Sequence, residues 1–368
     1  MSHFGLRIKR WLLIGIIGIG ICSIGFAFVI KNLFALITPN ILPWHLEGII
    51  VAFIGFGFVL ISGYGLFRSI GPFLFRYDSV NSLAQTIYER RSRERGPKIV
   101  AIGGGTGLSV LLRGIKEHTD NITAIVTVAD DGGSSGRLRR ELGLLPPGDI
   151  RNCLVALSDD EGLVAKLFQY RFDQGDGLEG HNFGNLFIAA MAEVSGSFEQ
   201  ALYESSKVLA VHGKILPATT DPLTLSAKLT DGTTVHGESN ITQSAGNINR
   251  LFIDPADIES NPDAITSINE ADIIVIGPGS LFTSILPNLL VPGINNALES
   301  TAARKIYVCN VAQEIGETDG YSAQDHVRTV QAYTSENIAD LVIINQPSVT
   351  MKGHRSIHQV IPGTKTAD

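Results

Sequence analysis

One pattern recurs through the second part of this 368-residue chain. A short, uninterrupted apolar segment runs directly into glycine or acidic residues, and a stretch with helical spacing follows it. The apolar segments are residues 98–102, 122–128, 271–276, 305–310 and 340–345. Strands buried on both faces read as continuous apolar runs, and their alternation with helices is typical of a parallel sheet. The pattern therefore predicts an α/β fold with a mostly parallel, doubly wound sheet.

Two further segments interrupt this alternation. Residues 149–210 are rich in helical patterns, which predicts a helical insert. Residues 223–229 and 233–236 resemble strands and flank Asp231-Gly232, a dipeptide favoured in two-residue turns. We therefore expect a β-hairpin beside the parallel sheet.

Charge is distributed unevenly along the chain. Residues 1–98 carry 11 basic and 4 acidic side chains, whereas residues 99–368 carry 18 and 32. An acidic body argues against a nucleic-acid binder, and 44% hydrophobic residues argue against a disordered chain. The three cysteines are too widely separated for a disulfide framework or a zinc site, which favours a reducing compartment for the body.

Two uncharged segments of 20 residues, 11–30 and 48–67, dominate the N-terminal part. At about 1.5 Å per residue, each would form a helix that spans the roughly 30 Å hydrocarbon core of a bilayer. The alternatives are two buried core helices, or a signal peptide followed by a core helix. The length and the lack of charge favour a transmembrane hairpin over residues 1–75.

Basic residues before the first span and after the second predict the orientation of this hairpin. Positive flanks stay on the cytoplasmic side, so we expect a two-pass protein of the bacterial cell membrane with both termini in the cytoplasm. Residues 76–97 are a basic juxtamembrane linker, either a short helix that contacts anionic lipid or a solvated connection. A cytoplasmic domain over residues 98–345 and a polar tail over 346–368 complete the predicted organisation.

The first candidate binding loop is Gly104, Gly105, Thr106 and Gly107, directly after the segment 98–102. Glycines let the backbone approach a phosphate, and a helix N-terminus favours an anion. The spacing matches neither the dinucleotide fingerprint nor the P-loop. The loop is thus either an anion site of another kind or a plain tight turn, and its position after a strand favours the anion site.

An acidic pair, Asp130 and Asp131, follows the next apolar segment. Adjacent carboxylates could hold Mg²⁺ or accept hydrogen bonds from ribose hydroxyls. The alternative is a flexible acidic loop in which Ser134 or Ser135 caps a helix.

Three other segments place polar residues where loops would meet helix N-termini. Asp149 is a candidate N-cap, Arg151 could reach an anion held by a neighbouring loop, and His181 could act as a general acid or base. Each of the three could equally be a structural group at the start of a helix. The remaining candidates are Asn152, Asn182, Asn185, Gly277, Pro278, Gly279 and Ser280.

Taken together, these segments resemble the YvcK/CofD-like family over roughly residues 98–345. The resemblance is carried by KIVAIGGGTGLSVLLRGIK, ITAIVTVADDGGSSGRLR, LPPGDIRNCLVALSD, GHNFGNLFIAA, GESNI, ADIIVIGPGSLFTSILPNLLVPGI and GETDGYSAQDHV. It implies a Rossmann-like fold with a nucleotide in the cleft between these loops. It also implies that the candidate residues line that cleft, with Tyr321 as a further ligand contact. Residues 310–316 depart from the usual family pattern, which puts contacts there in doubt.

The resemblance is strongest to the bacterial gluconeogenesis-factor branch. It implies a regulatory protein that binds a UDP-sugar such as UDP-N-acetylglucosamine, supports envelope synthesis and morphogenesis, and needs no cofactor beyond an optional Mg²⁺ at Asp130 and Asp131. The alternative is an Mg²⁺-dependent 2-phospho-L-lactate transferase of coenzyme F420 synthesis, in which Asp130, Asp131 and His181 would be catalytic. An NAD-dependent oxidoreductase is disfavoured by the glycine spacing. Candidate partners are the lipid bilayer, an enzyme of cell-wall or amino-sugar synthesis, and a second copy of the chain.

Overall fold

The computed structural model describes residues 91–345 except 160 and 245, together with Ser23, Ala27 and Val360. Apart from Ser23 and Ala27, the predicted membrane hairpin over residues 1–75 lies outside the described residues, and so does the tail over 346–368 apart from Val360. Within the described part, no helix combines the length and the apolar character needed to cross a membrane.

The core of the domain is a six-stranded sheet in which every neighbouring pair of strands is parallel. Its strands are β1 (Ile99–Gly103), β2 (Ile122–Val126), β3 (Lys214–Pro217), β7 (Ile273–Ile276), β8 (Arg304–Val308) and β9 (Leu341–Ile343). Their order is β3-β2-β1-β7-β8-β9, so the direction of winding reverses between β1 and β7. Ligands of such sheets bind beyond the carboxyl ends of the strands at this switch point. The predicted parallel α/β sheet is confirmed.

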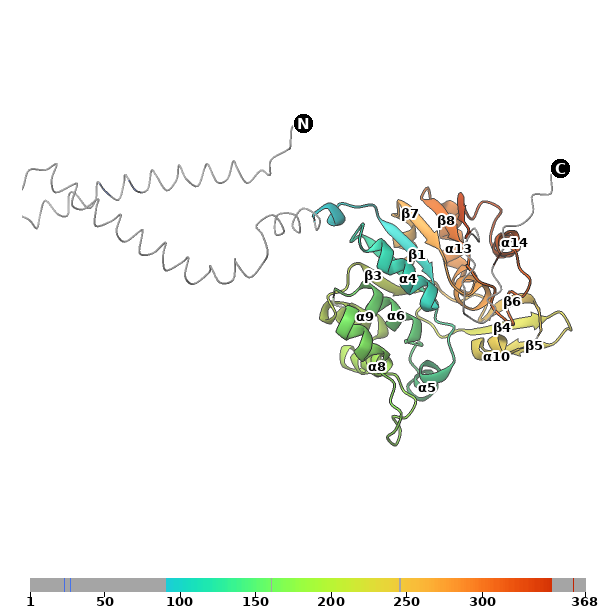
Figure 1. The fold of residues 1–368 in the computed structure, drawn as a ribbon, viewed down its shortest axis with the longest axis horizontal. Helices are drawn as coiled ribbons and strands as arrows, with labels where there is room; N and C mark the ends of the chain where they lie inside the picture. The colour runs from blue at the N-terminus through green and yellow to red at the C-terminus, as the bar shows by residue number, and fades with distance from the viewer. Residues whose placement is uncertain are drawn as a thin grey trace, which may run out of the picture. The chain divides into compact units, whose positions relative to one another are not determined.

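Side chains of β1 alternate between two hydrophobic cores, one on each face of the sheet. Ala101 faces a core formed with α4, α6, α8 and α9, whereas Val100 and Ile102 face a core formed with the later helices and the smaller sheet (Figure 1). The helices on the first side are α4 (Gly105–Ile115), α6 (Gly148–Leu157), α7 (Glu161–Gln169), α8 (Phe183–Ser195) and α9 (Phe198–Val208). Those on the second are α11 (Pro262–Asn269), a π-helical turn (Leu281–Ile285), α12 (Leu286–Leu289), α13 (Pro292–Ser300) and α14 (Ala323–Tyr333).

A small antiparallel sheet with the order β5-β4-β6 lies beside the main sheet. It consists of β4 (Thr224–Leu229), β5 (Thr234–His236) and β6 (Ile248–Asp254), with α10 (Glu238–Gln243) after β5. The predicted hairpin is β4 and β5, and its turn contains Gly232 with φ +88°. The sequence patterns did not indicate β6. Leu225 and Leu251 of this sheet pack into the second core, which fixes the sheet against the domain.

Candidate functional site

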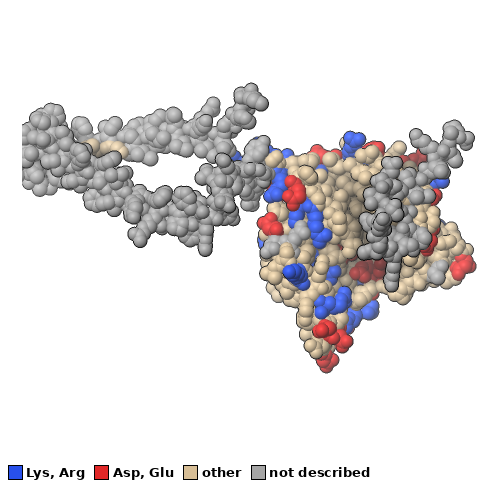
Figure 2. Space-filling model, viewed as in Figure 1, with Lys and Arg blue, Asp and Glu red and all other residues tan. Residues whose placement is uncertain are grey.

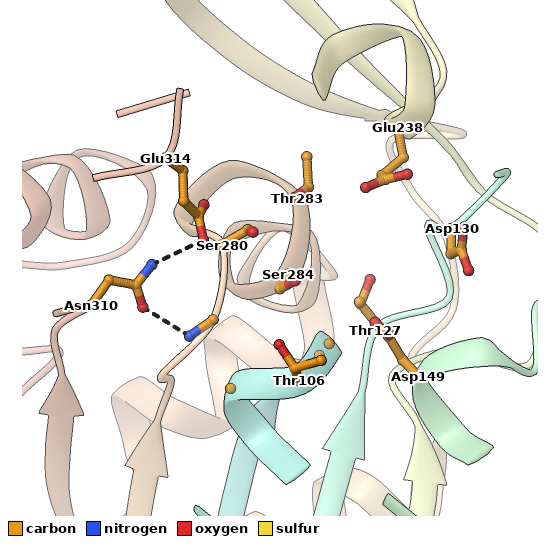
Figure 3. A pocket seen from close by; sticks show the side chains of 14 residues that line it. Thr106, Thr127, Asp130, Asp149, Glu238, Ser280, Thr283, Ser284, Asn310 and Glu314 are labelled. Atoms are coloured by element: carbon orange, nitrogen blue, oxygen red, sulfur yellow. Dashed lines mark hydrogen bonds between the residues drawn. The ribbon is translucent and has the colours of Figure 1, made fainter. Parts of the chain in front are cut away.

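A cavity of about 390 Å³ lies where the loops after β1 and β7 approach each other. It is therefore at the switch point of the parallel sheet. Its lining residues are Gly104, Gly105, Thr106, Gly107, Thr127, Asp130, Asp149, Glu238, Gly279, Ser280, Thr283, Ser284, Asn310 and Glu314. These residues come from both halves of the domain and meet only in the folded chain (Figure 3).

The glycines of the first loop are required by close backbone approach. Gly105 has φ +64°, in the left-handed region that glycine adopts without strain. A Cβ at Gly107 would lie 2.7 Å from the carbonyl oxygen of Pro278, in the loop after β7. The first turn of α4 therefore touches the opposite wall through backbone alone. The N–H groups of this first turn lie at the N-terminus of α4, where the helix dipole favours an anion.

The opposite wall is held in place by a hydrogen-bonded chain. The Gly279 N–H donates to Oδ1 of Asn310 over 3.0 Å, and Nδ2 of Asn310 donates to Oε1 of Glu314 over 3.4 Å (Figure 3). The hydroxyl of Ser280 also donates to the Glu314 carboxylate. Asn310 and Glu314 thus fix the loop that carries Gly279 and Ser280, although the sequence analysis left contacts of this segment in doubt.

Four carboxyl groups line the cavity: Asp130, Asp149, Glu238 and Glu314. Burial raises the pKa of Asp149 to about 6, although the Gly105 N–H donates to its carboxylate and favours the ionised form. Burial, with Asp130 and Asp131 nearby, raises the pKa of Glu238 to about 7. Burial also raises the pKa of Asp130 and of Glu314. The cavity therefore holds carboxyl groups that protonate near neutral pH.

A fifth carboxyl group, Glu317, is buried directly behind this wall. Its Oε1 accepts hydrogen bonds from Thr283 over 3.1 Å and from Thr242 over 3.4 Å. Burial, with Glu314 nearby, raises the pKa of Glu317 to about 7. Glu317 connects α10 to the π-helical turn and so ties two walls of the cavity together.

The two members of the predicted acidic pair point in different directions. The carboxylate of Asp130 lines the cavity and accepts hydrogen bonds from the Gly132 N–H, over 2.9 Å, and from the Ser135 hydroxyl. Asp131 is not among the lining residues, and its Oδ1 accepts a 2.9 Å hydrogen bond from the Ser239 N–H in the first turn of α10. Within the described part of the chain, no three His, Cys, Asp or Glu side chains are grouped to hold a metal ion. A divalent cation at Asp130 would therefore have to take most of its ligands from phosphate or water, as Mg²⁺ can.

Arg151, Asn152, His181, Asn182 and Asn185 lie behind Asp130 rather than in the cavity wall. Arg151 donates to Asn185 over 3.2 Å and to Asn152 over 2.9 Å. Burial and the proximity of Arg171 lower the pKa of Arg151, whereas Asp149 and Asp130 counteract this. Arg151 thus supplies a positive charge to the back of the acidic site.

The remaining polar residues join α8 to α5 (Gly133–Leu142). The Asn182 side chain caps α8 by accepting from the N–H groups of Gly184 and Asn185. Nδ1 of His181 lies 3.0 Å from the Ser134 hydroxyl, and Asn185 donates to the Ser135 hydroxyl over 3.3 Å. Ser135 in turn contacts Asp130, so this network positions a cavity residue from behind.

The structure thus divides the predicted site residues into two groups. Gly104 to Gly107, Asp130, Asp149, Gly279 and Ser280 line one cavity. Gly277 and Pro278 lie behind that wall, and Tyr321 packs edge-on against Phe282 and His326. The lining residues that the sequence analysis did not select are Thr127, Glu238, Thr283, Ser284, Asn310 and Glu314. Glu238 is the second residue of GESNI, one of the segments that resemble the family, so a signal for it was present.

Comparison with known proteins agrees with the motif analysis. Residues 99–361 match the family model described as 2-phospho-L-lactate transferase CofD. A putative gluconeogenesis factor from Nostoc is 49% identical over 94% of this chain and 78% of its own length. The gluconeogenesis factor of Bacillus subtilis is 53% identical over 69% of this chain and 80% of its own. A crystal structure of a Bacillus halodurans protein matches this chain with a TM-score of 0.68 and 50% sequence identity. The match covers 70% of this chain and 83% of the Bacillus halodurans chain. The chain therefore belongs to the CofD family, and its relatives at about 50% identity are named gluconeogenesis factors.

Proposed function

We propose that this domain is a regulatory protein that binds a UDP-sugar of the UDP-N-acetylglucosamine type in the cavity between β1 and β7. The observation that carries this proposal is the convergence of two glycine loops on one cavity at the switch point of the sheet. The names of the relatives support a role in gluconeogenic growth, in which such a protein would support envelope synthesis.

In this proposal the diphosphate lies against the first turn of α4. The N–H groups of Gly105, Thr106 and Gly107 supply donors at the positive end of the helix dipole. The Gly105 N–H already donates a hydrogen bond to the Asp149 carboxylate. A phosphate oxygen would replace this carboxylate as the acceptor. Carboxylates such as Glu238 accept hydrogen bonds from sugar hydroxyls on the opposite side.

The proposal includes a site for Mg²⁺ at Asp130. When bound, the ion would neutralise part of the diphosphate charge among the surrounding carboxylates. In the presence of Mg²⁺, Asp130→Asn should weaken nucleotide-sugar binding by about tenfold, about 1.4 kcal/mol. Asp131→Asn is the matched control, because the Asp131 carboxylate is turned toward α10. Equal effects of the two changes would argue against this assignment.

Calorimetry on the purified full-length chain tests the binding itself. We expect saturable binding of UDP-N-acetylglucosamine and weaker binding of UDP, with Mg²⁺ present and absent. Absence of saturation at millimolar ligand would remove the proposal.

Membrane anchoring by the segments 11–30 and 48–67 is part of the same proposal. The Nostoc relative matches 94% of this chain, which is more than residues 99–368 alone can supply, so part of the N-terminal region is shared with it. Sedimentation of the full-length chain with membranes after a carbonate wash is the expected result. Recovery in the supernatant would contradict anchoring.

The second candidate is a phosphotransferase of the 2-phospho-L-lactate transferase type, favoured by the family model that matches residues 99–361. A deazaflavin hydroxyl would attack the lactate-bearing phosphorus of lactyl-diphospho-guanosine and form a phosphodiester with it. The bond from this phosphorus to the bridging oxygen would break, GMP would leave with that oxygen, and the hydroxyl proton would be released. Phosphoryl transfer depends mainly on positioning and charge, so a protein nucleophile is not needed. GMP release that depends on the acceptor would support this activity, and zero turnover with Mg²⁺ would exclude it.

A further inference from the structure

A second hollow, of about 870 Å³, lies between the start of α5 and the loop that joins α7 to α8. We call it the arginine groove. Its lining residues are Gly133, Arg137, Arg140, Arg171, Gln174, Gly175, Asp176, Gly177, Glu179 and Gly180. None of them lines the cavity between β1 and β7. Figure 2 shows basic side chains gathered over α5, next to the projecting loop.

The three arginines of the groove contact backbone carbonyls or solvent. Arg137 donates to the backbone carbonyl of Glu179, and Arg171 donates to that of Gly180, each over 2.6 Å. Arg140 is exposed. Among the residues that the structure describes, none of the three forms a salt bridge.

The field of these arginines extends to neighbouring groups. The pKa of His181 is lowered by burial first and then by Arg137, and Arg171 acts in the same direction. Arg171 also lowers the pKa of Arg151. The lining of the groove holds these three arginines against two carboxylates, Asp176 and Glu179, which leaves a net charge of +1.

Guanidinium groups that face one space suit a phosphate, because each offers a planar fork of N–H donors to two oxygens. Gly133 adds the backbone N–H of the first residue of α5, at the positive end of that helix. The volume lies within the range of small-molecule sites, about 300–1,000 Å³. The flanking loop is fixed at both ends, since the Gly180 N–H donates to the Phe172 carbonyl and the Phe172 N–H donates to the His181 carbonyl.

We propose that the arginine groove binds a phosphate monoester of a small metabolite, as a second site beside the nucleotide-sugar cavity. Arg140 and Arg171 approach the phosphate from solvent-exposed positions, and Arg137 approaches it from the wall of α5. The cavity between β1 and β7 is lined by carboxylates, so a phosphate monoester without a cation is favoured at the groove instead.

The test titrates glucose 6-phosphate, inorganic phosphate and a phosphoserine peptide into the full-length chain at low salt. Arg140→Glu is the principal variant, because Arg140 is exposed and its loss leaves the two loop-binding arginines in place. Arg304→Glu is the matched control, with the same change of charge at an exposed position where β8 begins, at the end of the sheet opposite the loops. Thermal unfolding checks that both variants are folded.

We expect glucose 6-phosphate to bind at least as well as inorganic phosphate, and Arg140→Glu to weaken it at least tenfold. Arg304→Glu should change it less than twofold, and UDP-N-acetylglucosamine affinity should stay within twofold in both variants. Absence of glucose 6-phosphate binding to the unmodified chain would overturn the proposal, as would equal effects of the two variants. Tight binding of the phosphoserine peptide alone would overturn the assignment to a small metabolite. Arg171→Ala, with an expected loss of several-fold, provides a second variant if Arg140→Glu does not fold.

Discussion

The cavity between β1 and β7 and the arginine groove share one backbone feature, a helix N-terminus, but differ in the charge of the side chains around it. Each presents the first turn of a helix behind a glycine, α4 in the cavity and α5 in the groove. The cavity adds four carboxyl groups, whereas the groove adds three arginines. Asp130 of the cavity and Gly133 of the groove lie on the same loop. In our proposals a helix N-terminus alone therefore does not select a ligand, and the neighbouring side chains would decide which anion binds.

The difference also affects how each site can be used. If the proposed function holds, carboxyl groups that protonate near neutral pH would let the cavity accept a diphosphate when they are neutral, or a diphosphate with a cation when they are ionised. Arginine stays charged under both conditions, so the groove needs no cation. We expect three experiments to separate the two sites, in order of decreasing effect.

The largest effect is expected from Gly107→Ala. The added Cβ would lie 2.7 Å from the Pro278 carbonyl oxygen and 2.9 Å from its carbon, so the two loops must separate. UDP-N-acetylglucosamine affinity should fall by about 100-fold, about 2.7 kcal/mol, whereas glucose 6-phosphate binding at the groove should be unchanged. Gly114→Ala is the control, because a Cβ there, on the same helix, would meet nothing within 4 Å. Equal loss at both sites would show that the comparison between them is wrong.

A moderate effect is expected from pH, with opposite signs at the two sites. Between pH 8 and 6, Glu238, with a pKa of about 7, and Asp149, with a pKa of about 6, become more protonated. Repulsion of a diphosphate therefore decreases, and Mg²⁺-free UDP-N-acetylglucosamine should bind up to about tenfold more tightly at pH 6. A phosphate monoester loses charge near its second pKa of about 6, so glucose 6-phosphate should bind the groove more weakly.

Glu238→Gln identifies the group responsible at the cavity. The variant should bind UDP-N-acetylglucosamine more tightly at pH 8 and show a flatter pH profile, because one titrating charge is removed. Titrations at five pH values, with and without Mg²⁺, provide the measurement. An unchanged profile in Glu238→Gln would assign the dependence to another group.

The sequence predicted those parts of the fold that rest on local patterns. Continuous apolar runs identified β1, β2, β7, β8 and β9, since burial on both faces requires such runs. β3 (Lys214–Pro217) was missed because its apolar run is only Ile215 and Leu216, between a lysine and a proline. β6 was missed because Asn249 and Arg250 are exposed within it, which breaks the apolar run.

In the candidate site, too, only the residues that follow a local pattern could be predicted. The glycine loops and Asp130 could be predicted because each follows its own strand directly. Glu238 and Glu314 reach the cavity only because α10 and the segment after β8 pack over loops distant in sequence, which no local pattern encodes. Local sequence also cannot separate a helix cap from a ligand contact, and for Asn182 the structure shows the cap.

The smallest effect on binding is expected from Asn182→Ala, because Asn182 lines neither the cavity nor the groove. Its side chain accepts from the N–H groups of Gly184 and Asn185, so its loss removes the cap of α8 and should cost about 1 kcal/mol in the free energy of unfolding. The Asn182 backbone N–H, which donates to the Ser134 hydroxyl, is retained in the variant. Both UDP-N-acetylglucosamine and glucose 6-phosphate affinities should therefore stay within twofold, as measured by calorimetry beside urea unfolding. A tenfold loss of either ligand at unchanged stability would place Asn182 at that ligand and move the boundary between the two sites.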